Sequence, residues 1–266
     1  MPEFPWNQFG LLLAGGLLGV LAGMPFGLAL NRERLASAPI STRGVLLLSV
    51  LQNGLLIVIA TGAGLLISNQ IALGAPLLEG AFAGEGVLPL LLDRIPLAIG
   101  FGVAAAGIIL ALENSVFRSN IPQAVRRRPG SVALWKRFLV GFHGGINEEI
   151  LMRLFLFSLL AWLLGQIWRT ADHLPTVGVF WSANIGAALA FGLSHLPATA
   201  ALAPLTRSVV ARALLLNGIG GIVFGYLYWH SGLIAAMLAH FSADMVVLII
   251  GPQIIESSHN QLPASR

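Results

Sequence analysis

Long apolar stretches alternate with short polar segments along this chain. Seven of the stretches are long enough to cross a bilayer as helices, because about 20 apolar residues span its hydrocarbon core. Their apolar residues run continuously, whereas the strands of a membrane β-barrel alternate apolar and polar residues. The pattern therefore predicts an all-α protein, a polytopic transmembrane helical bundle. The expected spans are residues 9–30, 44–68, 96–116, 138–167, 179–201, 207–229 and 232–251.

The segment 69–95 does not follow this pattern. Gly and Pro residues interrupt it, together with Glu79, Glu85 and Asp93. We expect a long loop here, with an interfacial helix around 87–92. A further crossing within this segment would raise the count to eight spans.

The basic residues indicate how such a bundle is oriented. Three of the 15 Lys and Arg residues lie in 31–43, six in 117–137, two in 202–212 and one in the tail. With seven spans, all of these segments lie on one side of the membrane. Because short cytoplasmic loops are enriched in Lys and Arg, we expect a multi-pass protein with its N-terminus outside and its C-terminus in the cytoplasm.

Composition narrows the function only slightly. The chain is 56% hydrophobic, its net charge is +4 and it has no cysteine. The lack of cysteine excludes a thiol nucleophile, a thiolate metal site and disulfides. No basic patch carries interleaved aromatic residues, so we expect the lipid bilayer, and not a nucleic acid, as the partner of this basic chain.

Three polar motifs lie inside apolar spans, where charged groups are costly and usually functional. The first motif holds Glu148, Glu149 and Arg153 in the expected fourth span. The second ends at His195 in the fifth span. The third pairs His240 with Asp244 in the seventh span. We predict that the three motifs meet in one hydrolytic site within the bundle.

The spacing of the first motif predicts different roles for its two carboxylates. Glu149 and Arg153 are four residues apart, so they share a helix face and can neutralise one another. Glu148 points about 100° away from Glu149 around the helix and stays free. A desolvated free carboxylate is suited to act as a general base near neutral pH.

Two mechanisms fit these residues. In the first, Glu148 and His195 hold and deprotonate a water that attacks a peptide carbonyl, and His240 stabilises the oxyanion. In the second, His195, His240 and a carboxylate bind zinc, which activates the water. The chain lacks the compact His-Glu-x-x-His zinc motif, which weakens the second mechanism. No cofactor is required with certainty, and zinc is the one that the second mechanism would need.

The three motifs, in this order on separate membrane helices, resemble those of the CPBP family. This family groups CAAX prenyl endopeptidases with bacteriocin-processing (Abi) proteins, and the resemblance covers about residues 135–250. Its motifs are Glu-Glu-x-x-x-Arg, Phe-x-x-x-His and His-x-x-x-Asn/Asp. The matching positions here are Glu148, Glu149 and Arg153, then Phe191 and His195, then His240 and Asp244.

The resemblance implies an intramembrane endopeptidase with a peptide or membrane-protein substrate. It makes Glu148 the catalytic glutamate, with Glu149 and Arg153 completing the first motif. It gives His195 a role in holding the water, and gives His240 and Asp244 roles in oxyanion stabilisation. The eukaryotic-type enzymes carry Asn where this chain has Asp244. Members have been classed both as metalloproteases and as glutamate proteases, so the resemblance leaves both mechanisms open.

The expected organisation follows from the extent of the resemblance. Residues 1–130 are N-terminal transmembrane helices, residues 131–252 are the catalytic helical core, and residues 253–266 are a short polar tail. We expect the site to face the cytoplasm, because His195 lies near that end of its span. The alternative is a catalytically silent membrane scaffold or assembly factor of the same fold. A transporter with a Glu148–His195 proton relay is a third reading. The sequence does not indicate an oligomeric state.

Overall fold

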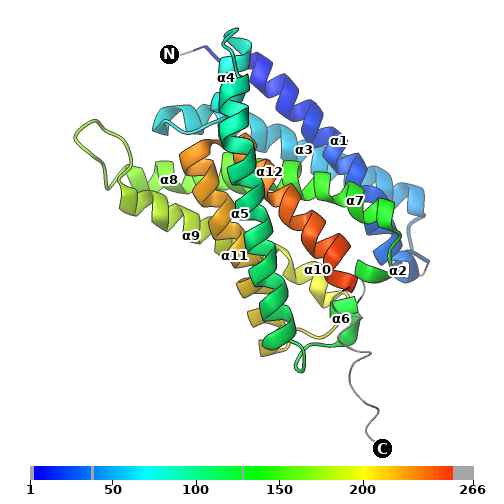
Figure 1. The fold of residues 1–266 in the computed structure, drawn as a ribbon. Helices are drawn as coiled ribbons and strands as arrows, with labels where there is room; N and C mark the ends of the chain where they lie inside the picture. The colour runs from blue at the N-terminus through cyan, green and yellow to red at the C-terminus, as the bar shows by residue number, and fades with distance from the viewer. Residues whose placement is uncertain (1–2, 37–38, 128, 254–266) are drawn as a thin grey trace, which may run out of the picture.

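The fold is helical throughout the part of the chain that the computed structural model describes, residues 3–36, 39–127 and 129–253 (Figure 1). This region contains no β-strand, and six of its helices are long and apolar enough to cross a membrane. The predicted all-α, multi-pass membrane architecture is therefore confirmed. The six candidate spans are Trp6–Leu30, Thr42–Ile71, Leu91–Ser115, Val177–Ala200, Arg207–Ser231 and Leu233–Gln253.

Short helices connect these long ones. The long helices are α1 (Trp6–Leu30), α3 (Thr42–Ser68), α5 (Leu88–Ser115), α9 (Val177–Ser194), α11 (Arg207–Ser231) and α12 (Leu233–Met245), which continues as the π-helix η5 (Val246–Ile250). The short ones are α2 (Arg32–Ala36), η1 (Asn69–Ile71), α4 (Pro76–Phe82), α6 (Gln123–Arg127), η2 (Pro129–Ser131) and α10 (Leu196–Ala200).

The expected fourth span forms a composite helix that is not among the six candidates. It runs through α7 (Leu134–Phe142), the π-helices η3 (His143–Glu148) and η4 (Ile150–Phe157), and α8 (Ser158–Gly165). A π-helix is rare and usually brief, and it occurs often at functional sites. Here it coincides with the charged motif, and α1, α3, α9, α11 and α12 all contact its π-helical part.

Two expectations for residues 69–95 differ from the structure: the expected long loop is largely helical, and its short helix lies elsewhere. A separate interfacial helix was expected around 87–92, but α5 already begins at Leu88 and continues through Pro96. The short helix of this region is instead α4, which starts at Pro76. Proline fits the first turn of a helix because its missing N–H would have no partner there, which explains the start of α4.

The regular helix of the fifth expected span is interrupted at a catalytic candidate. Its α-helix ends at Ser194, and α10 resumes at Leu196 with Pro197 in its first turn. His195 therefore lies at the junction, beyond the regular part of α9. Proline disfavours a continuous helix, because its ring clashes with the preceding turn.

The outer surface of the bundle is apolar. On α3, Leu47, Leu51 and Leu55 are each more than half exposed and recur every fourth residue. Such a stripe suits contact with lipid chains. The interior is closed by tight helix contacts, for example at Gly102, where a Cβ would meet the backbone of Ala239 on α12.

Candidate active site

The first motif contains a fully buried ion pair. Glu149 Oε1 lies 3.1 Å from Nη1 of Arg153, and their side chains are 0% and 1% exposed. Nη2 of Arg153 donates to the carbonyl of Gly221 on α11 at 3.0 Å. The guanidinium also lies over the rings of Phe191 and Phe224, at 5.1 and 5.5 Å. The i,i+4 spacing predicted this pair, and its burial makes it a structural centre of the bundle.

Glu149 also binds the histidine of the third motif. Nδ1 of His240 donates to Glu149 Oε1 at 2.6 Å. The imidazole is buried and stacks on the ring of Phe224, with centroids 4.6 Å apart. A hydrogen bond to one ring nitrogen fixes which nitrogen remains for chemistry. The carboxylate of Glu149 therefore leaves Nε2 of His240 facing the cavity.

Two further carboxylates face that nitrogen. Oε2 of Glu148 is 3.7 Å and Oδ1 of Asp244 is 3.9 Å from Nε2 of His240. The side chain of Glu148 is 26% exposed, whereas that of Glu149 is fully buried. The two neighbouring glutamates thus have different surroundings, and Glu148 is the one in contact with the cavity.

His195 is oriented by its own helix. Its Nδ1 donates to the carbonyl of Phe191 at 2.8 Å, and its ring meets the Phe191 ring edge-on at 4.8 Å. Nε2 is left without this contact and is available as an acceptor. His195 lines the same cavity as Glu148.

One cavity of about 350 Å³ brings these groups together. Four of the six predicted site residues line it, while Glu149 and Arg153 lie behind it. The four are Glu148, His195, His240 and Asp244. The rest of the lining is largely apolar and comes from α1, α5, α7, η3, α9, α10, α11, α12 and η5.

Gly144 allows η3 to approach α12 closely. A Cβ at this position would overlap Oδ2 of Asp244 and would lie 3.2 Å from Nε2 of His240. A Cβ on Gly145 would similarly lie 3.0 Å from the carbonyl oxygen of Met237 on α12. The Gly-Gly step therefore permits Glu148 and His240 to share one cavity.

His143 is a cavity residue that the sequence pattern did not predict. It begins η3, five residues before Glu148, and both side chains line the cavity. In a π-helix the hydrogen-bonding period is five residues, so these two side chains share a face. Nothing in the sequence marks a π-helix, and the α-helical period would have pointed His143 elsewhere.

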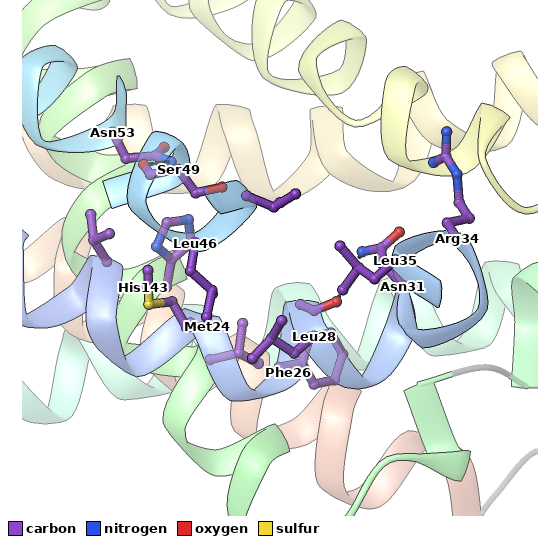
Figure 2. Close-up of a pocket in the computed structure, with 15 residues that line it drawn as sticks. Met24, Phe26, Leu28, Asn31, Arg34, Leu35, Leu46, Ser49, Asn53 and His143 are labelled. Atoms are coloured by element: carbon purple, nitrogen blue, oxygen red, sulfur yellow. Dashed lines mark hydrogen bonds between the residues drawn. The ribbon is translucent and has the colours of Figure 1, made fainter. Parts of the chain in front are cut away.

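A second cavity, of about 580 Å³, adjoins the first. Figure 2 shows Met24 and Phe26 of α1 and Leu46 of α3 around it, with His143 at one end and Arg34 at the other. The two cavities share Phe26, Val140 and His143 in their linings. The second cavity is mainly apolar and lies next to the candidate active site.

The donor groups do not make a recognisable metal site. No group of three His, Asp or Glu side chains among the described residues is arranged to hold a metal ion. His240 uses Nδ1 on Glu149, and its Nε2 lies 3.7 and 3.9 Å from the two nearest carboxylate oxygens. Ligand atoms that share one zinc with bonds of about 2 Å lie about 3.3 Å apart in a tetrahedral site, so Nε2 would have to approach each carboxylate by about half an ångström to share a metal with it.

The comparison with known families agrees with this arrangement. Residues 129–246 match the family described as Type II CAAX prenyl endopeptidase Rce1-like, and this stretch contains all three polar motifs. No curated protein and no solved structure shows significant similarity to the chain. Membership of this family implies a membrane protease with peptide substrates. Residues 129–246 therefore form a domain of the Rce1-like type II CAAX prenyl endopeptidase (CPBP) family.

Proposed function

We propose that the protein is an intramembrane endopeptidase in which Glu148 activates the attacking water. The observation that carries this proposal is the pairing of Glu148 with His240. Oε2 of Glu148 and Nε2 of His240 lie 3.7 Å apart in a cavity that His195 also lines. A base, a second water ligand and an oxyanion donor are the three parts that peptide hydrolysis needs.

The first step forms the bond between water and the peptide carbonyl carbon. Glu148 takes a proton from the water, which also donates its other hydrogen to Nε2 of His195. The carbonyl oxygen gains the negative charge, and His240, protonated at Nε2, donates to it. Preorganised donors of this kind contribute about 3–4 kcal/mol to transition-state stabilisation.

The second step breaks the peptide bond. Glu148 returns its proton to the leaving amine as the tetrahedral intermediate collapses, and the new carboxyl end is released. Glu149 keeps the His240 ring in position through the 2.6 Å hydrogen bond. Asp244, 3.9 Å from Nε2 of His240, orients the same ring or shares a proton with the oxyanion.

We also propose that the composite helix from Leu134 to Gly165 spans the membrane, which gives seven spans. In Figure 1, α2, α6 and α10 lie toward the same end of the bundle, as the alternating topology requires. The positive-inside rule then gives an outside N-terminus and a site that opens to the cytoplasm. Residues 131–252 are the proposed catalytic core and residues 1–130 the N-terminal helices, whereas the expected tail lies outside the described residues from 254 onward.

The larger cavity is suited to bind an apolar part of the substrate. It is mainly apolar, holds about 580 Å³ and shares His143 with the candidate active site. A membrane peptidase must hold an apolar part of its substrate beside the cleaved bond. We assign this role to the cavity between α1, α2 and α3.

The decisive experiment compares cells that express the wild-type chain with cells that express Glu148→Gln. Membrane and secreted proteins are profiled for new chain ends by terminal-labelling mass spectrometry. We expect a set of cleavage products that disappears in Glu148→Gln and persists in the control Glu85→Gln, which changes an exposed carboxylate. Unchanged products in Glu148→Gln would refute the assignment of the base.

A further inference from the structure

Arg212 presents a guanidinium to the cavity that holds Glu148. It lies near the start of α11, and it lines the cavity together with His195 and Asn217. Its Nε donates to Oε2 of Glu113 at 2.6 Å. The side chain is 22% exposed, whereas the carboxylate side chain of Glu113 is 5% exposed.

Glu113 does not neutralise both of its partners. Its other oxygen, Oε1, accepts from Nε of Arg126 at 3.1 Å. Arg126 is further engaged with the carbonyl of Arg118 and with Oδ1 of Asn114. One carboxylate therefore lies between two guanidinium groups, and this end of the cavity keeps a positive charge.

The terminal nitrogens of Arg212 are available to a ligand. The bond from Nε to Glu113 is the only hydrogen bond that Arg212 makes with the described residues. This bond fixes the side chain and leaves Nη1 and Nη2 free. Asn217 uses its amide toward the Ala213 carbonyl and keeps one N–H. Four guanidinium N–H groups and one amide N–H are thus available at this end.

The packing of α9 against α11 places Arg212 at the level of His195. A Cβ on Gly221 would lie 2.8 Å from Cα of Ala188, and a Cβ on Gly192 would lie 3.0 Å from Cα of Leu214. The helices are therefore antiparallel, and one further turn brings His195 opposite Arg212. The second end of the cavity is marked by Phe224, which stacks on His240.

We propose that Arg212 forms a subsite that binds a carboxylate of the peptide substrate. This inference rests on the proposed peptidase function. A guanidinium with two free nitrogens matches the two oxygens of a carboxylate. Glu148 and Asp244 repel an anion at the other end of the cavity. The field along the cavity therefore sets the direction in which the peptide binds.

The geometry limits how far the carboxylate lies from the cleaved bond. Phe224 follows Arg212 by twelve positions, or about 18 Å along α11. An extended peptide covers about 3.3–3.6 Å per residue, so the carboxylate lies within about five residues of the cleaved bond. Either the C-terminal carboxylate of a short chain end or an acidic side chain would meet this requirement.

A binding experiment tests the subsite without catalysis. Full-length Glu148→Gln protein in nanodiscs is titrated with three fluorescent apolar pentapeptides. One has a free C-terminal carboxylate, one is amidated, and one is amidated with a terminal aspartate. We expect the free acid to bind about tenfold or more tightly than the plain amide, since charge-assisted hydrogen bonds have this strength. Equal binding of the acid and the amide would overturn the proposal.

Substitutions of Arg212 and Arg207 then test whether Arg212 causes the preference for the carboxylate peptide. Arg212→Gln should abolish the preference for the carboxylate, and Arg212→Lys should keep part of it. Arg207→Gln, an exposed change five residues earlier on the same helix, should leave the preference intact. Because Arg126 still pairs with Glu113, Arg212→Gln leaves no carboxylate unpaired. If the preference persists in Arg212→Gln, the subsite lies elsewhere and the proposal fails.

The peptides also separate the two sources of the carboxylate. Tight binding of the free acid alone identifies a chain end, and tight binding of the aspartate amide as well identifies any acidic group. In protein that keeps Glu148 and can therefore cleave, Arg212→Gln should raise KM for the free-acid peptide with little change in kcat. A preference in binding without any cleavage by the wild-type protein would refute the peptidase function and leave the subsite standing.

Discussion

Glu149 holds the ring of His240 through a hydrogen bond of 2.6 Å between Oε1 and Nδ1. The same oxygen lies 3.1 Å from Nη1 of Arg153. The first and third sequence motifs are therefore joined by one atom. This link explains how a carboxylate with no contact to the cavity can still control the geometry of the site.

Replacing Glu149 with Gln should destabilise the protein strongly. The substitution leaves Arg153 buried without a counter-charge, and breaking a buried pair in this way costs about 3–5 kcal/mol. The free energy of unfolding can be measured by chemical denaturation in detergent micelles. The neighbouring substitution Glu148→Gln removes a carboxylate that is 26% exposed and should cost less than about 1 kcal/mol.

A double variant checks the cause of this loss. Glu149→Gln combined with Arg153→Met removes both charges and should recover much of the stability, while His240 stays unanchored and cleavage stays low. Equal stability of the single variant and the wild type would show that the ion pair contributes nothing.

Asp244→Asn should retain cleavage within about tenfold of the wild type. The amide can donate to an oxyanion as well as accept, so it replaces the polar contact near Nε2 of His240. Asp244→Leu removes that contact and should lower kcat about 100-fold, because misplacing the His240 donor should cost about as much as losing one oxyanion donor. If Asn behaves like Leu, the negative charge of Asp244 is itself required.

Gly144→Ala should inactivate the protein without unfolding it. Its Cβ would overlap the carboxylate of Asp244 and press on His240, which separates η3 from α12. A displacement of about 1 Å in an active site typically costs about 100-fold in rate. The control is Gly218→Ala on α11, where a Cβ meets no atom within 4 Å. Normal cleavage by Gly144→Ala would show that the close approach is unnecessary.

Gly27→Leu should raise KM by filling the larger cavity. Gly27 lines this cavity, and a Cβ there has no neighbour within 4 Å, so a larger side chain enters empty space. Gly107→Leu is the matched control, since this exposed glycine on α5 also has open space around it. Kinetics on one cleaved peptide should show a rise in KM for Gly27→Leu alone. An unchanged KM would exclude this cavity as a substrate site.

Sequence patterns predicted the parts of this fold that depend on neighbouring residues. The long apolar runs gave the six candidate spans, and the four-residue spacing gave the buried pair of Glu149 with Arg153. These are local properties, set by helix geometry and by the thickness of the bilayer. The three motifs also identified three of the helices that line the candidate site, but not α1, α5 or α11.

The sequence alone did not predict the individual contacts between helices that are distant along the chain. The bond from His240 to Glu149 joins residues 91 positions apart, and no spacing rule predicts it. The π-helical turns at η3 likewise depend on packing against α12, so the position of His143 beside Glu148 was missed. α5 also continues through Pro96, although proline usually breaks or kinks a helix.

The double use of one Glu149 oxygen affects how related genes should be interpreted. A descendant that has lost peptidase activity still needs a counter-charge for its buried Arg153, so purifying selection on folding alone preserves Glu149 and Arg153. The persistence of these two residues is therefore poor evidence of activity. In the described part of the chain, neither Glu148, which is 26% exposed, nor His195 neutralises the buried Arg153, so drift should erase them first in a catalytically silent lineage. Their joint presence is the better genomic marker of a working enzyme.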